Sequence, residues 1–235
     1  MLDKNLLVHI VLPKRCDLCG DTVTYSADIC DVCNESLPFI DLDKRCKKCG
    51  CEKTSCCCYR RFHHYKESAS AFYYDGCVKT GIIRLKINGY PDGAETFAKY
   101  MFETVKNVYG DILFDMISYV PLSKGTLKRR GFNQSRLLAD KLSNALDIPD
   151  LPLLEKLYDV NPQRRMTAQQ RKANIFGVFD VCREYDINGK TILLVDDVIT
   201  TGATVGECAV MLKIYGAAAV YVITAAATKI ERQDS

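Results

Sequence analysis

The residues from Ile192 to Thr204 combine two carboxylates with a hydroxyl-rich turn. A short apolar run is followed by Asp196 and Asp197, and then by the turn Thr200, Thr201, Gly202, Ala203 and Thr204. Backbone N–H groups at a helix N-terminus bind anions, and a glycine lets the backbone approach a phosphate closely. Adjacent carboxylates repel each other unless a ribose diol, Mg²⁺ or a basic side chain binds them. We therefore predict a site for a phosphorylated ribose; the alternative is a capping cluster in an ordinary strand-to-helix turn.

Ten of the 13 cysteines lie in the first sixty residues, which predicts a separate cysteine-rich unit there. Cys16-x-x-Cys19 and Cys30-x-x-Cys33 have the spacing of a ribbon in which four thiolates hold one structural Zn²⁺. A disulfide framework would need an oxidising compartment, yet neither a targeting segment nor a membrane-length apolar run is visible. The sequence therefore predicts a cytoplasmic protein without membrane insertion, whose cysteines bind metal; metal-free structural cysteines are the alternative.

A second zinc ribbon is expected to begin at Cys46-x-x-Cys49, followed by glycine as in the first. Its closing pair is irregular, because three consecutive cysteines stand where a second Cys-x-x-Cys would be expected. Adjacent thiolates rarely reach one metal together, so we predict Cys56 with Cys58 as the closing ligands. Other candidates are Cys51, His63 and His64. Two structural Zn²⁺ per chain are expected.

Positive charge is concentrated in residues 121–174, which hold 11 Lys and Arg against 5 Asp and Glu, although the whole chain carries only +3. This stretch indicates an anionic small molecule or a polynucleotide, and a solvated basic face is the alternative. Within it, Asn133 suits a helix N-cap, which leaves Arg130 and Gln134 for contact with a ligand.

The chain is 48% hydrophobic and 26% charged, which excludes a disordered protein. From about residue 65 to residue 230, strand-like runs alternate with helical patterns. Strands are expected at 68–74, 115–120, 191–195 and 217–226, and helices at 76–88, 91–109, 135–146 and 204–215. This alternation predicts an α/β domain with a mainly parallel sheet, preceded by the double zinc-ribbon module of residues 1–62.

The segment from Ile192 to Thr204 resembles the loop that binds phosphoribosyl pyrophosphate (PRPP) in type I phosphoribosyltransferases. The resemblance implies a Rossmann-like parallel sheet and Mg²⁺ bound together with PRPP. It also implies that Asp196 and Asp197 face the ribose hydroxyls, while residues Thr200 to Thr204 surround the 5′-phosphate.

Further motifs are similar, in order and spacing, to the ComF family of competence-associated proteins. They are Leu85-Lys86 with Gly89, Val120-Pro121-Leu122, Arg130 to Gln134, and Gln163 with Arg171, Asn174 and Phe179. Together with the cysteine module, this resemblance covers nearly the whole chain. It implies that Lys86 and Arg130 lie toward the pyrophosphate, and that the protein has a role in natural competence.

Two functions are therefore considered. The first is a PRPP-binding, phosphoribosyltransferase-like protein associated with DNA uptake, in which the basic stretch and the zinc ribbons hold single-stranded DNA. The alternative is an active phosphoribosyltransferase of nucleotide metabolism with no role in DNA binding. Enzymatic turnover stays open at this point, because no segment suited to reading a nucleobase is visible.

Overall fold

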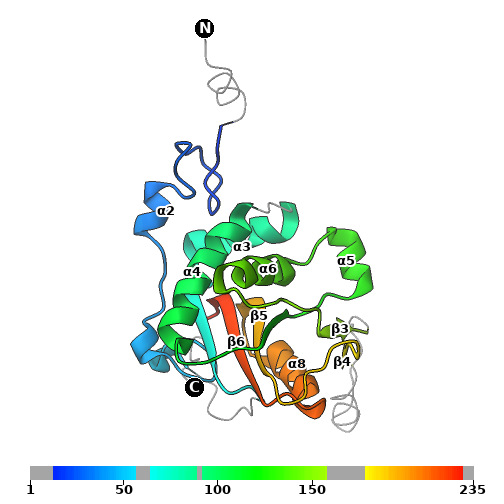
Figure 1. The fold of residues 1–235 in the computed structure, drawn as a ribbon. Coiled ribbons are helices and arrows are strands. Elements are labelled where there is room, and N and C mark those ends of the chain that lie inside the picture. The colour runs from blue at the N-terminus through cyan, green and yellow to red at the C-terminus, as the bar shows by residue number, and fades with distance from the viewer. Residues whose placement is uncertain (1–12, 57–63, 89–91, 158–177, 230–235) are drawn as a thin grey trace, which may run out of the picture.

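The computed structural model describes residues 13–56, 64–88, 92–157 and 178–229 of the chain (Figure 1). Cys58, His63, Gly89, Gln163, Arg171 and Asn174 lie outside these ranges. The elements are α2 (Asp31–Glu35), η1 (Leu42–Lys44), η2 (Lys53–Ser55), β1 (Ser68–Tyr73), α3 (Gly76–Asn88), α4 (Asp92–Tyr109), β2 (Met116–Tyr119), α5 (Lys124–Arg130), α6 (Gln134–Leu146), β3 (Leu154–Lys156), β4 (Phe179–Val181), β5 (Thr191–Ile199), α8 (Ala203–Ile214) and β6 (Ala219–Ala227).

Four parallel strands form one sheet in the order β1-β6-β5-β2. In its centre, Leu194 of β5 is aligned with Val222 of β6 and with Ser118 of β2. Strands covered on both faces are expected to be apolar throughout, and residues Ile192 to Val195 are fully buried. The parallel sheet confirms the predicted α/β class.

Helices cover both faces of this sheet (Figure 1). α4 and α6 pack on one face, with α3 against α4, while α8 packs on the other face. Side chains of β5 alternate accordingly, because Leu193 and Val195 join the core under α4 and α6, whereas Ile192 and Leu194 join the core under α8. The carboxyl ends of the strands therefore open between two helical layers, where α/β sheets bind their ligands.

The two cysteine turns have the same local structure. The Gly20 N–H donates to the carbonyl of Cys16 at 2.9 Å, and the Gly50 N–H donates to the carbonyl of Cys46 at 2.9 Å. Both glycines have positive φ angles, 89° and 75°, which strain residues with a side chain. The repeated Cys-x-x-Cys-Gly sequence thus forms a repeated turn.

Both turns pack onto the α/β core. Leu18 of the first turn is 1% exposed and lies so close to α3 that a Cβ at Gly81 would be 2.8 Å from the Leu18 side chain. Asp17 accepts a 2.5 Å hydrogen bond from Thr96 of α4. In the second turn, Cys51 belongs to the core cluster beneath α8. The module and the domain share their cores, and the boundary between residues 1–62 and 65–230 stays a prediction.

The segment that joins the two turns runs along the free side of β1. Tyr73 N–H donates to the Pro38 carbonyl at 2.8 Å, and Ile40 N–H donates to the Ala71 carbonyl at 3.3 Å. The Phe39 ring lies 5.0 Å from the Phe72 ring. Backbone and aromatic contacts therefore fix the module to the sheet.

Within the α/β domain, the structure differs from the predicted elements in three main places. β5 continues through the acid pair to Ile199, because pairing with β6 continues as far as Ala227. A short helix, α5, carries the basic cluster that the sequence left without an element, and a small antiparallel pair, β3 and β4, was not predicted. None of the helices in the described ranges has both the length and the apolar character that crossing a bilayer requires.

Candidate functional site

The acid pair lies near the carboxyl end of β5 and is almost completely buried. Asp196 is 9% exposed and Asp197 is 5% exposed. Asp196 Oδ1 accepts two hydrogen bonds of 2.9 Å each, from the Ser135 hydroxyl and from the Asp197 N–H. Ser135 reaches this position because Asn133 caps α6 and donates its side-chain amide to the Val120 carbonyl. The end of β2 and the start of α6 therefore orient Asp196.

Burial raises the pKa of Asp196 to about 8, and the neighbouring charge of Asp197 adds to this effect. The hydrogen bonds from Ser135 and from the Asp197 N–H act in the opposite direction but are weaker. The raised pKa favours the protonated form of Asp196 at neutral pH. A ligand that brings hydroxyl donors or a cation to the pair would stabilise the ionised form of Asp196.

Lys86 is the basic partner of Asp197. Its Nζ lies 2.6 Å from Asp197 Oδ2, and the Lys86 side chain is 27% exposed. That buried oxygen has no hydrogen bond of ordinary geometry within the described part of the chain. It can therefore accept a hydrogen bond from a hydroxyl or bind a divalent cation, and the donor set fits both a ribose diol and Mg²⁺. α3 positions Lys86, and the first cysteine turn packs against the same helix at Gly81.

The loop from Thr200 to Thr204 begins α8 around a small hollow. Gly202 is the N-cap residue with a φ of 73°, and its carbonyl accepts the N–H of Gly206 at 2.9 Å. The hollow has a volume of about 20 Å³ and is lined by Asp196 and by the loop residues Thr200, Gly202, Ala203 and Thr204. Thr201 points its hydroxyl oxygen toward the Ala203 N–H, at 3.3 Å. A cavity of this volume holds about one water molecule, so a phosphate would require the loop to widen.

Arg130 ends α5 and is held by the next helix. Its Nη1 donates to Gln134 Oε1 at 3.3 Å, and Lys128 and Arg129 share the last turn of α5. Asn133 is the N-cap of α6, as its position in the sequence suggested. The two residues predicted to contact a ligand are therefore in contact with each other. Neither Arg130 nor Lys86 lines the hollow beside the loop.

Four cysteines of the first ribbon converge on one point. The sulfur atoms of Cys16, Cys19, Cys30 and Cys33 all lie within 4.8 Å of one another. The Cys19 and Cys30 sulfurs are 3.7 Å apart. Tetrahedral zinc with Zn–S distances of ~2.3 Å requires sulfur separations of about 3.8 Å, so the cluster has the dimensions of a zinc site.

Backbone hydrogen bonds favour the thiolate form of one cysteine in this cluster. Burial opposes ionisation of the Cys16 thiol. Backbone N–H groups that donate to its sulfur outweigh this effect and lower the pKa of Cys16 to about 7; the N–H of Cys30 is one of them, at 3.3 Å. Burial raises the pKa of Cys19 to about 11. A divalent cation would remove this opposition to ionisation, because metal-bound cysteines are thiolates.

The second cluster contains three cysteines in the described residues. Cys46, Cys49 and Cys56 have their sulfurs within 4.8 Å of one another. Cys51 is not among them: its thiol donates to the Thr228 carbonyl at 3.5 Å, and it contacts the cluster through the Cys49 thiol. The predicted fourth ligand, Cys58, lies outside the described residues. This geometry supports Cys56 over Cys51 as a closing ligand.

Ser135 is the site residue that the sequence did not reveal. Its hydroxyl makes the side-chain hydrogen bond that orients Asp196, across 61 positions of the chain. The available signal was its place two residues after the Asn133 cap, where a short polar side chain can turn back toward the strand ends. That signal is common to many helix N-termini and does not identify a binding site.

The comparisons with known proteins together extend over most of the chain. Residues 132–235 match the family described as "Phosphoribosyl transferase domain". The chain is 30% identical over 224 residues to "DNA utilization protein YhgH" of Escherichia coli (strain K12), covering 91% of this chain and 96% of that protein. It is also 30% identical over 139 residues to "Competence protein ComFC" of Bacillus subtilis (strain 168), covering 59% of this chain and 55% of that protein.

Among solved structures, a glutamine PRPP amidotransferase from B. subtilis aligns at a TM-score of 0.42 and 21% identity, over 56% of this chain and 26% of that one. This likeness is too distant to add to the assignment, which depends on the sequence relatives and on the phosphoribosyl transferase match. Because YhgH aligns along nearly its whole length, the chain belongs to the ComF family.

Proposed function

We propose that the protein binds PRPP together with Mg²⁺ at the carboxyl end of β5 and acts in DNA uptake. Asp196 and Asp197 would accept the ribose hydroxyls, and the loop from Thr200 to Thr204 would surround the 5′-phosphate. Lys86 and Arg130 would face the pyrophosphate. The observation that carries this proposal is a buried carboxylate pair, oriented by Ser135 and Lys86, on the strand that leads into the glycine-capped N-terminus of α8.

Each part of the site would have a distinct task. The Gly202 turn would direct backbone N–H groups at the start of α8 toward the phosphate, once the loop has widened to admit it. Lys86 would hold the Asp197 side chain in place through their ion pair, and Asp197 would accept hydrogen bonds from the ribose hydroxyls. Mg²⁺ would supply positive charge to the pyrophosphate when bound. The pyrophosphate would then be neutralised from the α3 side by Lys86 and from the α5 side by Arg130.

The link to DNA depends on the relatives. They are named for DNA utilization and for competence, and the basic last turn of α5 offers a surface for a phosphate backbone. We propose single-stranded DNA as the partner of this surface. The two cysteine clusters would hold structural Zn²⁺, and thiols kept reduced for that purpose favour a cytoplasmic location.

Thermal unfolding of the zinc-loaded protein with PRPP and Mg²⁺ tests the ligand site. Saturating ligand stabilises the native state by about 3 kcal/mol at a concentration one hundred times Kd, which raises Tm by several degrees in a chain of this size. Asp196→Asn combined with Asp197→Asn should abolish the rise, whereas Asp115→Asn, at the opposite end of β5, should retain it. An unchanged Tm of the unsubstituted protein at millimolar PRPP would refute the site.

Pyrophosphate release and oligonucleotide binding separate the two functions. DNA binding that weakens with salt, without release of pyrophosphate from PRPP across a panel of bases, supports the role in DNA uptake. Turnover with one base and no DNA binding would instead establish the alternative, a phosphoribosyltransferase of nucleotide metabolism.

A further inference from the structure

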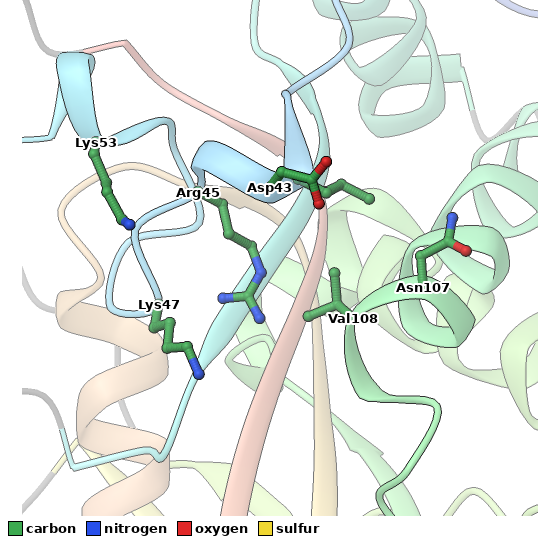
Figure 2. A pocket seen from close by; sticks show the side chains of 7 residues that line it. Asp43, Arg45, Lys47, Lys53, Asn107 and Val108 are labelled. Atoms are coloured by element: carbon green, nitrogen blue, oxygen red, sulfur yellow. The ribbon is translucent and has the colours of Figure 1, made fainter.

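A groove lies between the second cysteine turn and the C-terminal end of α4. Its volume is about 770 Å³, within the ~300–1,000 Å³ typical of small-molecule pockets. Figure 2 shows the side chains that line it, among them Asp43, Arg45, Lys47, Lys53, Asn107 and Val108. The Lys47 carbonyl accepts the N–H of Ser68, the first residue of β1, at 2.7 Å. The groove is therefore near the amino end of β1, whereas the acid pair is near the carboxyl end of β5.

Arg45 is the buried cation of this groove. It is 8% exposed, its Nη2 lies 2.8 Å from Glu67 Oε2, and its guanidinium lies 5.8 Å from the centre of the Tyr109 ring. Its other terminal nitrogen, Nη1, is buried without a hydrogen-bond partner in the described ranges. Buried donors on charged groups are normally paired, because leaving one unpaired costs stability. Nη1 therefore offers a donor to an acceptor that is not part of the described chain.

The first cysteine turn shows that this arrangement is not needed to build the turn. Arg15 precedes Cys16 just as Arg45 precedes Cys46, and each arginine begins a short antiparallel bridge, to Thr22 and Glu52 respectively. Arg15 donates Nη1 to the Gly20 carbonyl of its own turn, at 3.2 Å. Arg45 instead pairs with Glu67, and its side chain extends into the groove (Figure 2). The difference points to a role in binding.

Two lysines add positive charge beside Arg45. Lys47 Nζ lies 2.8 Å from Glu67 Oε1, so Glu67 forms ion pairs with both Arg45 and Lys47. Lys53, the first residue of η2, also lines the groove (Figure 2). The facing wall is different in kind, with Val108 supplying apolar surface and Asn107 an amide. The groove thus has a cationic wall opposite a wall suited to an uncharged ring.

We propose that this groove binds a nucleoside 5′-monophosphate. The planar fork of Arg45 and the ammonium groups of Lys47 and Lys53 match a phosphate dianion. Val108 packs against the sugar or base, and Asn107 with Asp43 bonds to polar atoms of the base. A single buried guanidinium in a pocket of one-nucleotide volume can bind one phosphate, whereas a DNA strand requires an extended basic surface. The groove therefore favours a mononucleotide over a DNA strand.

Calorimetric titration of the zinc-loaded full chain with AMP, GMP, CMP and UMP tests this assignment. We expect one saturable site for at least one of them. Arg45→Lys keeps the charge but removes the fork, and should weaken binding at least about tenfold. Lys53→Ala should weaken it about two- to fivefold. The matched controls are Arg15→Lys and Lys44→Ala, which change the same residue types outside the groove and should leave the affinity unchanged.

Other outcomes overturn the proposal. If inorganic phosphate binds as tightly as the nucleotides, the groove is an anion site only. If only an oligonucleotide binds, it belongs to a DNA surface. Binding that is lost with Asp197→Asn but not with Lys53→Ala would place the nucleotide at the β5 site. If Arg45→Lys does not fold, Lys53→Ala combined with Asn107→Ala, both at exposed positions, decides the question, and unchanged affinity in that variant refutes the groove.

Discussion

Replacing Asp196 with asparagine should stabilise the ligand-free protein. The pKa of Asp196 is raised from 3.8 to about 8, chiefly by burial and then by the charge of Asp197. Between these two values the folded chain holds a proton that the unfolded chain has released. Stability therefore falls as pH rises through this window, by up to about 1.4 kcal/mol per pH unit. At pH 7 this amounts to at most about 4 kcal/mol relative to an ordinary aspartate.

Asp196→Asn removes the titrating group while its amide oxygen can still accept the hydrogen bonds of Ser135 and of the Asp197 N–H. Because the amide also brings N–H donors that the site does not pair, we expect a net gain of about 1–3 kcal/mol at pH 7. Urea unfolding of variant and parent at pH 5, 6, 7 and 8 measures this gain. The buffer should contain neither Mg²⁺ nor a chelator, since a chelator would also remove zinc. The gap between variant and parent should widen with pH.

Asp115→Asn is the control of opposite sign. The Thr191 N–H and the Lys190 ammonium lower the pKa of Asp115, so its ionised form stabilises the fold and the variant should lose stability. That loss should be present at pH 7 and disappear in acid, below the usual aspartate pKa of 3.8. If Asp196→Asn instead destabilises the protein, or if its effect does not change from pH 5 to pH 8, Asp196 is not a strained, proton-holding carboxyl and the argument for the acid pair fails.

Three further predictions concern other parts of the molecule. Elemental analysis should give two zinc ions per chain, and Cys30→Ser should reduce this to one; a value below one in the parent would refute both clusters. Leu18→Ala should destabilise the whole α/β domain by about 2–4 kcal/mol in urea unfolding, because Leu18 packs on α3; a loss confined to the cysteine module would contradict the shared core. Neutralising Lys128, Arg129 and Arg130 together should flatten the salt dependence of single-strand binding, by roughly 0.7 in log-log slope for each lost phosphate contact, and an unchanged slope would place the DNA elsewhere.

The sequence predicted the parallel sheet because its signals were local. Residues Ile192 to Val195 form a continuous apolar run, and the cysteine pairs recur at fixed spacing, so both features are visible in short windows. The end of β5 was missed because two carboxylates interrupt its apolar pattern, and only pairing with β6 keeps the backbone extended through them. The acid pair was recognised from its residue types, but its orientation by Ser135 depends on a contact between distant segments.

The association of the cysteine turns with the core was also not predicted. Leu18 and Cys51 stand among cysteines and polar residues, and nothing in their neighbourhood indicates that Leu18 packs on α3 and Cys51 under α8. Such contacts depend on tertiary packing. The same is true of Arg45, whose sequence context is nearly that of Arg15 although the two side chains are placed differently.

The backbone bonds between residues 38–40 and β1 have a consequence for aggregation. β2, at the other edge of the sheet, is covered by a nearby segment, since Leu151 donates to the Ile117 carbonyl at 2.9 Å. Among the described residues, the free side of β1 is paired by the stretch around Phe39 and by the Lys47 carbonyl, both of which belong to the cysteine module. A chain shortened to begin at residue 65 would therefore present an unpaired, largely apolar parallel strand to other copies of itself, and open strand edges of this kind recruit further strands. The module thus protects the sheet from self-association. Its loss should therefore reduce the solubility of the protein, even where ligand binding at the β5 site is retained.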